Sequence, residues 1–171
     1  MEAIVAVTAN WGIGKDNGLL ISIPEDMKFF RTTTSNAIVI MGRKTLESFP
    51  GGRPLKNRIN IVITRDEAYA PEGVIIVHTP KEAAAKAEEL RKVNLKEDGG
   101  ERNIFVIGGA SIYRQMYGMC DTIYVTKVDK EMEADAFFPD LDSDPEWKVA
   151  EESPEAVYEG TTYKFVTYKK I

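Results

Sequence analysis

Cysteine and histidine are almost absent from this sequence, which has Cys120 and His78 as its only examples among 171 residues. A single cysteine cannot form a disulfide within the chain, and these two residues are too few for a metal site built from cysteine and histidine. Any nucleophilic triad that requires a histidine would have to use His78. We therefore expect no bound metal, and the chemistry of the chain has to come from its other polar side chains.

Long apolar runs and an excess of positive charge are also missing. No stretch approaches the ~18 apolar residues of a membrane-spanning helix, and the opening MEAIVAVTAN shows no positively charged leader. The net charge of −5 provides no basic stripe to neutralise nucleic-acid phosphates. With 43% hydrophobic and 29% charged residues, we expect one globular domain over residues 1–171. It is predicted to be a soluble, cytoplasmic monomer with no nucleic-acid or membrane partner.

The apolar pattern predicts alternating strands and helices. Short runs rich in Val and Ile indicate strands, and longer runs with helical spacing indicate helices. After Val128 only strands are expected, ending in a hairpin. This order predicts an α/β fold with a mainly parallel sheet, helices on both faces and an antiparallel C-terminal edge. The expected strands are Ala3–Val7, Ala37–Met41, Ile59–Ile63, Val74–Val77, Ile104–Ile107, Thr122–Val128, Ala156–Tyr158 and Tyr163–Tyr168, and the expected helices are Pro24–Thr33, Lys44–Ser48, Pro80–Val93 and Ser111–Tyr117.

Asp26 is the acid whose position a folding argument alone does not explain. In the first expected helix it shares a face with Ile23, Phe29 and Phe30, which lie three or four residues away. An ionised carboxylate is costly among apolar side chains, and its pKa tends to rise there. Asp26 could simply complement the positive end of the helix dipole, but Glu25 already does this from the solvated face. We therefore favour a chemical role for Asp26.

Two expected strands run directly into glycine and then into a helix, at Gly42 and at Gly108-Gly109. Helix N-termini offer free N–H groups, and glycine lets a phosphate approach the backbone closely. Either turn alone could reflect packing, but two on parallel strands suggest a ligand with two phosphate groups. Arg43, Lys44 and Arg65 place cations where an NAD site usually carries an acid, which favours NADP.

The ordered motifs of the chain resemble those of the dihydrofolate reductase family, in its single-domain bacterial type. The motifs cover nearly the full chain in the family's order: GIGKDNGLL, IPEDMKFF, IVIMGRKTLES, GRPLKNRINIVITR, VIGGASIY, IYVTKVD and ADAFFP. The resemblance implies an eight-stranded mixed sheet and an NADPH-dependent oxidoreductase. Its small-molecule substrate would be 7,8-dihydrofolate, reduced by hydride transfer from the nicotinamide to the pterin with protonation at N5, to give 5,6,7,8-tetrahydrofolate.

The resemblance also implies roles for particular residues. Asp26 would hydrogen-bond the amidine-like edge of the pterin and assist protonation, with Thr126 behind its carboxylate. Arg58 would clamp the α-carboxylate of the glutamate tail, and the loop Asn10–Ile23 would close over the cofactor. The residues implied in catalysis are Asp26, Thr126, Leu19, Ile21 and Tyr113. Those implied in substrate binding are Val5, Ala6, Asp26, Met27, Phe30, Arg31, Phe49, Leu55, Arg58, Ile107 and Thr126.

A larger set is implied in cofactor binding, and ordinary structural roles compete with several of these assignments. Thr126 suits any strand, Met27 and Phe30 suit any core, and His78 could be a surface residue beside an edge strand. The cofactor residues are Ala6, Ile13, Gly14, Gly18, Leu19, Gly42, Arg43, Lys44, Thr45, Ile63, Thr64, Arg65, His78, Ile107, Gly108, Gly109, Ala110, Ser111, Ile112 and Tyr113.

One departure from the family pattern is the pair Leu20-Ile21, where the family usually has Pro-Trp. Isoleucine cannot donate the indole hydrogen bond that normally helps to hold a water beside the acid. Two other functions compete with dihydrofolate reduction. The first is the pyrimidine reductase of the riboflavin pathway, which shares the fold and uses NADPH but lacks an acid like Asp26. The second is a non-catalytic nucleotide-binding module, against which Asp26 and Thr126 argue.

Overall fold

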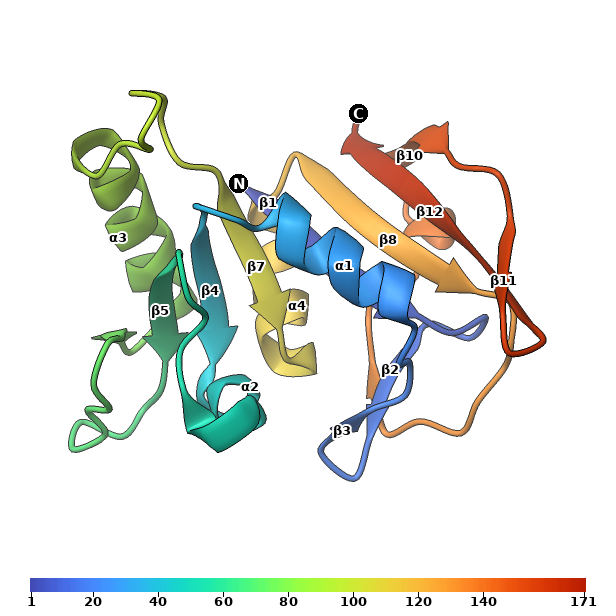
Figure 1. Ribbon diagram of the computed structural model, residues 1–171, viewed down its shortest axis with the longest axis horizontal. Helices are drawn as coiled ribbons and strands as arrows, with labels where there is room; N and C mark the ends of the chain where they lie inside the picture. Colours follow the sequence, from blue (N-terminus) through green and yellow to red (C-terminus); the bar gives the residue numbers. More distant parts are fainter.

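The computed structural model describes all 171 residues, and its centre is one nine-stranded sheet (Figure 1). Four α-helices and three short 3-10 turns pack around this sheet or lie in its connections. The strands of the sheet are β1 (Glu2–Val7), β4 (Ile38–Gly42), β5 (Ile59–Ile63), β6 (Ile75–Val77), β7 (Ile104–Gly108), β8 (Thr122–Val128), β10 (Trp147–Glu152), β11 (Ala156–Tyr158) and β12 (Thr161–Lys170). The helices are α1 (Pro24–Thr33), α2 (Arg43–Glu47), α3 (Pro80–Val93) and α4 (Ala110–Met116), and the 3-10 turns are η1 (Pro50–Gly52), η2 (Tyr117–Met119) and η3 (Leu141–Ser143).

The strand order is β10-β12-β8-β1-β7-β4-β5-β6, and β11 pairs with β12. From β8 to β6 the neighbouring strands are parallel, whereas β12 runs antiparallel to β8, β10 and β11. This confirms the predicted mainly parallel sheet with an antiparallel C-terminal edge. The expected count of eight strands is wrong by one, because β10 was missed. After Trp147 every residue of β10 is exposed, so the strand carries no alternating apolar pattern.

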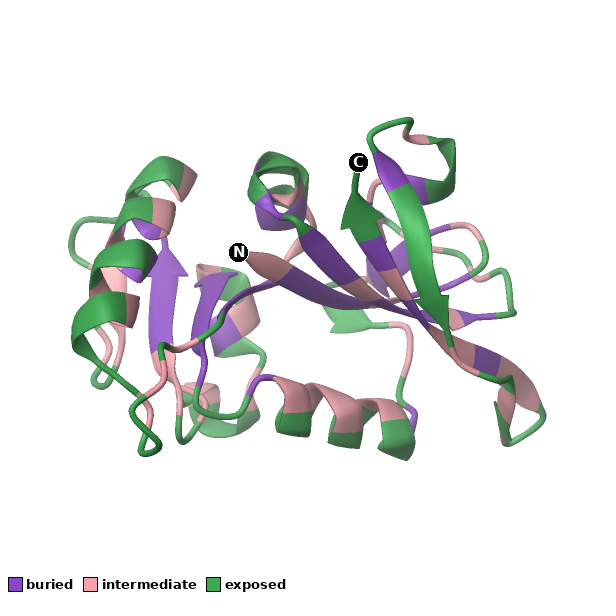
Figure 2. Cartoon of the chain, turned by 90° about the horizontal axis from the view of Figure 1, so that it is seen from above, coloured by how far each residue is buried: buried purple, intermediate pink, exposed green.

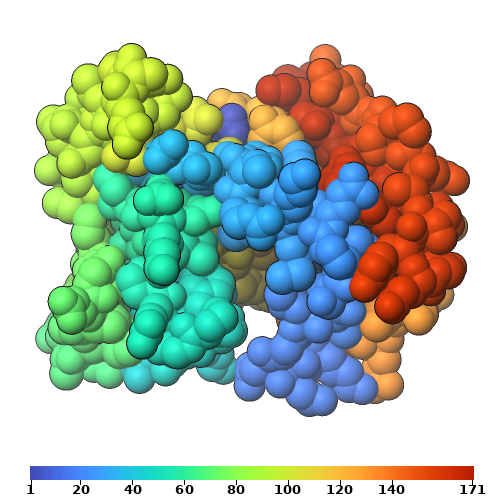
Figure 3. Space-filling view, in the orientation of Figure 1, coloured from blue at the N-terminus to red at the C-terminus, as the bar shows by residue number.

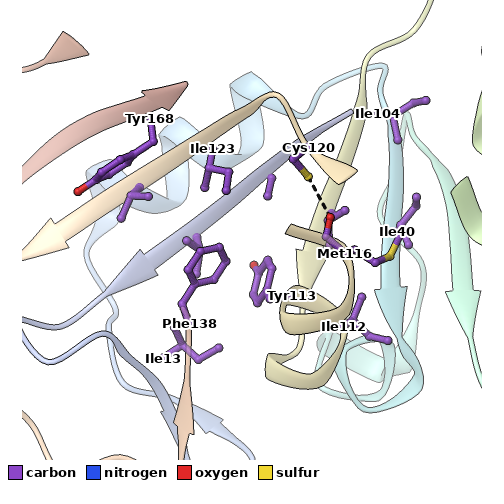
Figure 4. Close-up of a cluster of buried hydrophobic side chains, with 14 of the residues drawn as sticks. Ile13, Ile40, Ile104, Ile112, Tyr113, Met116, Cys120, Ile123, Phe138 and Tyr168 are labelled. Atoms are coloured by element: carbon purple, nitrogen blue, oxygen red, sulfur yellow. Dashed lines mark hydrogen bonds between the residues drawn. The ribbon is translucent and has the colours of Figure 1, made fainter. Parts of the chain in front are cut away.

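Side chains of the central strands alternate between two apolar clusters, one on each face of the sheet. Ile40 of β4 joins Ile112 and Met116 of α4 in the larger cluster, which also includes residues of α3. Figure 4 shows this cluster and the hydrogen bond from Cys120 to the Met116 carbonyl. Met41, the next residue of β4, instead joins the smaller cluster under α1 and α2. Helices therefore cover both faces, as predicted.

Helix α1 has the boundaries and orientation that the sequence predicts. It begins at Pro24, whose missing N–H is unpaired at a helix start anyway. Asp26, Phe29 and Phe30 are half-buried, whereas Glu25 is exposed. Figure 2 shows α1 with intermediate and exposed residues only. No residue of α1 is fully buried. The helix lies over the sheet with Asp26 turned inward.

The segment 10–23, expected as a loop, contains a small hairpin. Strands β2 (Gly12–Lys15) and β3 (Gly18–Leu19) form a second sheet with β9 (Ala136–Phe137). Asp16 and Asn17 form the turn with φ of 51° and 63°, and asparagine and aspartate tolerate such values. The backbone N–H of Asp16 donates to Asp135 Oδ2 at 2.9 Å. These strands were missed because they are too short to show a period.

None of the four α-helices has the length and apolar character needed to cross a bilayer; α3, with 14 residues, is the longest. No group of three or more His, Cys, Asp or Glu side chains is arranged to hold a metal ion.

Candidate active site

The inward face of α1 brings Asp26 against β8. Thr126 Oγ1 donates a hydrogen bond to Asp26 Oδ1 at 2.6 Å, although the two residues are 100 positions apart. Thr126 is buried, and in the sheet it lies opposite Ala6 of β1 and Phe165 of β12. Burial raises the pKa of Asp26 above its ordinary value, and the hydrogen bond from Thr126 opposes part of this rise. The pair is therefore a carboxyl group with increased proton affinity, held in a defined orientation.

A cleft opens below α1 between the α2–η1 segment and the β2–β3 hairpin (Figure 3). Apolar side chains belong to the elements around it. Phe30, Phe49 and Leu55 are half-buried against the smaller cluster. Met27 is 56% exposed and Leu19, on the hairpin, is 88% exposed. Uncovered apolar side chains around a cleft are typical of a site for a flat organic molecule.

Strand β1 supplies residues to both faces of the sheet. Val5 belongs to the larger cluster, on the face away from Asp26. Its part in substrate binding stays a prediction. Ile4 lies on the α1 side instead, together with Ile107 of β7.

Tyr113 is held by a backbone contact. Its hydroxyl donates to the Ile4 carbonyl at 2.7 Å, and burial raises the pKa of the phenol well above its usual range. Its ring lies 4.9 Å from that of Phe138, in the cluster that also contains Ile13 (Figure 4). The structure thus brings the predicted residues Ile13 and Tyr113 together, with the Tyr113 hydroxyl fastening α4 to β1.

Arg58 has two donors to spare at the end of α1. Its Nε donates to Thr34 Oγ1 at 3.0 Å, Nη1 to the Lys56 carbonyl at 2.7 Å and Nη2 to the Arg31 carbonyl at 3.0 Å. Three of the five guanidinium N–H groups are therefore used, and one remains on each terminal nitrogen. Burial, followed by the nearby charge of Arg31, lowers the pKa of Arg58 from its ordinary value. A rigid guanidinium with a free N–H on both terminal nitrogens suits a carboxylate.

The carboxyl ends of the parallel strands meet at one edge of the sheet. In the strand register Gly42 lies beside Ile63, and Met41 beside Gly108. A Cβ on Gly42 would approach Ile112 to 3.2 Å, and Gly108 has φ of +128°, which L side chains rarely adopt. The predicted turns at the starts of α2 and α4 are therefore close neighbours, and each has a specific need for glycine.

A cavity of about 380 Å³ lies beyond the ends of β5 and β6. His78 Nδ1 is 2.8 Å from the Thr64 carbonyl, so this nitrogen carries the proton. Thr79, Pro80 and Gln115 were missed as lining residues. Thr79 and Pro80 come just after His78, which follows β6 as Thr64 follows β5. The lining residues are Ile63, Thr64, Arg65, His78, Thr79, Pro80, Ser111, Ile112 and Gln115.

The remaining predicted cofactor residues have mixed surroundings. Arg43 is already paired with two carboxylates. Lys44 and Arg65 are exposed and form no ion pair. Gly14 and Gly18 belong to the hairpin, where Gly14 pairs with Leu19 and Lys15 with Gly18. Thr45 Oγ1 lies near both glycines of the β7–α4 turn, within 3.6 Å of where their Cβ atoms would stand, while Gly109 is the N-cap of α4 and Ala110 its first residue.

Ile21, the departure from the expected Trp, packs at the start of α1. Its side chain contacts a small cluster built on Ile23, Val128 and Tyr163. The hydroxyl of Tyr163 donates to Glu25 Oε2 at 2.6 Å. Aliphatic packing and this hydrogen bond hold the first turn of α1 on the terminal hairpin.

Comparison with known proteins gives one consistent assignment. A family model described as dihydrofolate reductase matches residues 1–170. Dihydrofolate reductase of Bacillus subtilis is 37% identical over 169 residues, 98% of this chain and 92% of the relative. That of Neisseria meningitidis serogroup A is 40% identical over 166 residues, 96% of this chain and 94% of the relative. A solved dihydrofolate reductase from Enterococcus faecalis, complexed with NADP(H) and RAB-propyl, has a TM-score of 0.81 and 31% identity over 99% of this chain and 95% of its own. Since the match extends along the whole chain in sequence and in structure, this protein belongs to the dihydrofolate reductase family.

Proposed function

We propose that this chain reduces 7,8-dihydrofolate to 5,6,7,8-tetrahydrofolate with NADPH, and that Asp26 and Thr126 form its proton-handling pair. The observation that carries the proposal is the half-buried carboxyl of Asp26, which accepts a 2.6 Å hydrogen bond from a buried threonine. Family membership gives the reaction, and this contact indicates which residues serve it.

Asp26 would bind the amidine-like edge of the pterin. A carboxylate accepts two parallel N–H bonds from such an edge, and this contact replaces water around a partly desolvated acid. Because burial raises the pKa of Asp26, the group also holds a proton more readily than an exposed aspartate. The hydroxyl proton of Thr126 uses one lone pair of Oδ1, so the second lone pair of Oδ1 and both lone pairs of Oδ2 remain to accept from the ligand.

The residues at the carboxyl edge of the sheet fit NADPH. Glycine at positions 42 and 108 keeps the starts of α2 and α4 close together, since a Cβ there would meet Ile112 at 3.2 Å or Tyr113 at 3.4 Å. The neighbouring cavity is lined by Thr64 and Arg65. Arg65 and Lys44 would hold the phosphate on the adenosine ribose. When bound, NADPH supplies the hydride. The chain's part is to orient the two rings in the cleft and to exclude water from them.

The proposal is tested by following NADPH oxidation with and without dihydrofolate, in the parent and in Asp26→Asn. We expect oxidation only with dihydrofolate, and a loss of about 10²–10⁴-fold in turnover near pH 7 in the variant, the usual contribution of a positioned acid or base. Glu151→Gln replaces an exposed carboxylate on β10, away from α1, by its amide and is the control. A folded parent that binds NADPH but shows no dihydrofolate-dependent oxidation between pH 5 and 8 would refute the proposal.

The same assay separates the pyrimidine reductase of the riboflavin pathway and a non-catalytic nucleotide-binding module. The first should oxidise NADPH with a pyrimidine substrate, and the second should bind NADPH without oxidising it. Asp26 and the free donors of Arg58 favour dihydrofolate over both, because neither alternative has a use for them.

The proposed functional unit is a single domain of residues 1–171. We propose that it acts as a cytoplasmic monomer without a nucleic-acid or membrane partner. The continuous sheet from β10 to β6 supports the single domain, since both halves of the chain contribute strands to it. The lone cysteine supports a cytoplasmic protein, since it needs no disulfide, and the net charge of −5 argues against binding to nucleic acid. Light scattering at micromolar concentration, and a nucleic-acid binding assay, test these statements.

A further inference from the structure

Arg43, at the start of α2, is held on three sides by its own chain. Its Nη1 donates to Asp66 Oδ2 at 3.1 Å and its Nε to Glu47 Oε1 at 3.3 Å. The guanidinium carbon also lies 4.1 Å from the centre of the Tyr69 ring, within cation–π range. Arg43 is therefore fixed in orientation, and its positive charge is largely matched by two carboxylates.

Unlike that of Arg43, the side chains of Lys44 and Arg65 have no carboxylate partner. Both are exposed and neither takes part in an ion pair, while Arg65 lines the cavity beyond β5. Asp66 directly follows Arg65, and its side chain is 48% exposed. A half-exposed carboxylate, bound to Arg43, thus directly follows Arg65, which with Lys44 we assign to the ribose phosphate.

We propose that Asp66 is a specificity-determining residue that weakens the preference of this site for NADPH over NADH. The inference rests on the proposed NADPH site and concerns residues outside the cofactor set named above. A ribose phosphate carries about two negative charges, so the carboxylate of Asp66 repels it and also occupies a donor of Arg43. A ribose with a free hydroxyl lacks that charge and avoids most of this cost.

The size of the effect follows from Coulomb's law in a solvated site. At a separation of about 8 Å, near the screening length at physiological salt, removing one negative charge should favour a doubly charged phosphate by about three- to tenfold. The pyrophosphate is common to both cofactors, so a change in its binding cancels in the ratio of their dissociation constants. The ratio therefore isolates the contribution of the ribose phosphate.

Asp66→Asn removes the charge of Asp66 and should preserve the local backbone, because asparagine can keep the hydrogen bonds that the residue makes in its own turn. Its Oδ1 accepts from the Ala68 backbone N–H at 2.9 Å, and its own N–H donates to Thr64 Oγ1 at 3.2 Å. Asparagine keeps an oxygen for Ala68 and removes the charge, so the turn after β5 should survive. Glu151→Gln is the matched control, because it neutralises an exposed acid on β10, at the opposite edge of the sheet.

The experiment measures equilibrium dissociation constants for NADPH and NADH by fluorescence titration, without dihydrofolate, at about 0.02 M and 0.5 M salt. In Asp66→Asn we expect the ratio of the NADH constant to the NADPH constant to rise about three- to tenfold at low salt, with the gain shrinking at high salt. Glu151→Gln should leave the ratio unchanged. Melting temperatures confirm that both variants are folded.

Two results would overturn the inference. An unchanged ratio in Asp66→Asn, with NADPH still bound by the parent, would show that the carboxylate is indifferent to the ribose phosphate. A ratio that falls would show that Asp66 mainly orients Arg43 toward the phosphate, the reverse of the proposed effect. A parent that binds neither cofactor would refute the proposed function itself, which the titration distinguishes from failure of the inference alone.

Discussion

Replacing Arg58 with alanine should weaken binding of dihydrofolate through its glutamate tail while sparing the pterin. Arg58 uses three N–H groups on Thr34 and on the carbonyls of Lys56 and Arg31, and it keeps one donor on each terminal nitrogen. Those two donors match the two oxygens of a carboxylate. The substitution removes both at once.

The magnitude follows from the number of free donors. Each hydrogen bond between charged groups contributes about 1.5–3 kcal/mol, which gives about 3–6 kcal/mol for two. Arg58 is only half-buried, so water competes for the tail and the lower figure applies. A loss of about 3 kcal/mol corresponds to roughly a 10²-fold rise in the KM for dihydrofolate. The carbonyls of Lys56 and Arg31 also lose their donor, and we expect about 1 kcal/mol less stability.

The assay compares dihydrofolate with a dihydropterin that has no glutamate tail. Arg58→Ala should raise KM for dihydrofolate about 10²-fold and leave the pterin's kinetics nearly unchanged. Arg58→Lys keeps the charge but cannot donate from two coplanar nitrogens, so it should recover only part of the loss. Equal losses for both substrates would refute the clamp and would show that Arg58 acts only by holding the end of α1.

Three further outcomes are expected. Ile21→Trp should cost about 1–3 kcal/mol of stability because its neighbours, including Tyr163, are packed around isoleucine; faster turnover with an unchanged melting temperature would show instead that the site lacks only an indole donor. Thr126→Val removes the hydrogen bond that lowers the pKa of Asp26, so the pH–rate profile should move to higher pH, and a profile that stays in place would argue against the pair. Burial raises the folded-state pKa of Asp26, so the parent loses stability as the pH rises from below the ordinary value of 3.8 through the raised value. Urea unfolding should therefore find Asp26→Asn more stable than the parent at pH 7, and this difference should vanish at acid pH.

Local pattern was enough to predict most elements of the fold. The boundaries of α1, α3, β5, β8 and β11 agree with the sequence prediction. Both helices begin at a proline, and the three strands are short, mostly apolar runs bounded by polar residues. The same periodicity oriented α1 and turned Asp26 inward. Strands β2, β3, β9 and β10 were not predicted. The first three are too short to show an apolar period, and β10 has no alternation of apolar and polar residues.

The sequence by itself also determined which chemical groups were available at the carboxyl edge of the sheet, because parallel strands place their ends together. Only the tertiary structure decided how these groups are partnered. Arg43 was expected to be a phosphate ligand, but the fold brings Asp66, 23 positions later, within hydrogen-bonding distance of it. The catalytic role of Tyr113 stays a prediction, but only the fold shows that its hydroxyl donates to the carbonyl of Ile4, 109 positions away. The sequence determines which charged groups and hydrogen-bond donors the chain has. Whether a charge is neutralised or a donor is free depends on distances between remote segments, and these are set only when the segments pack together.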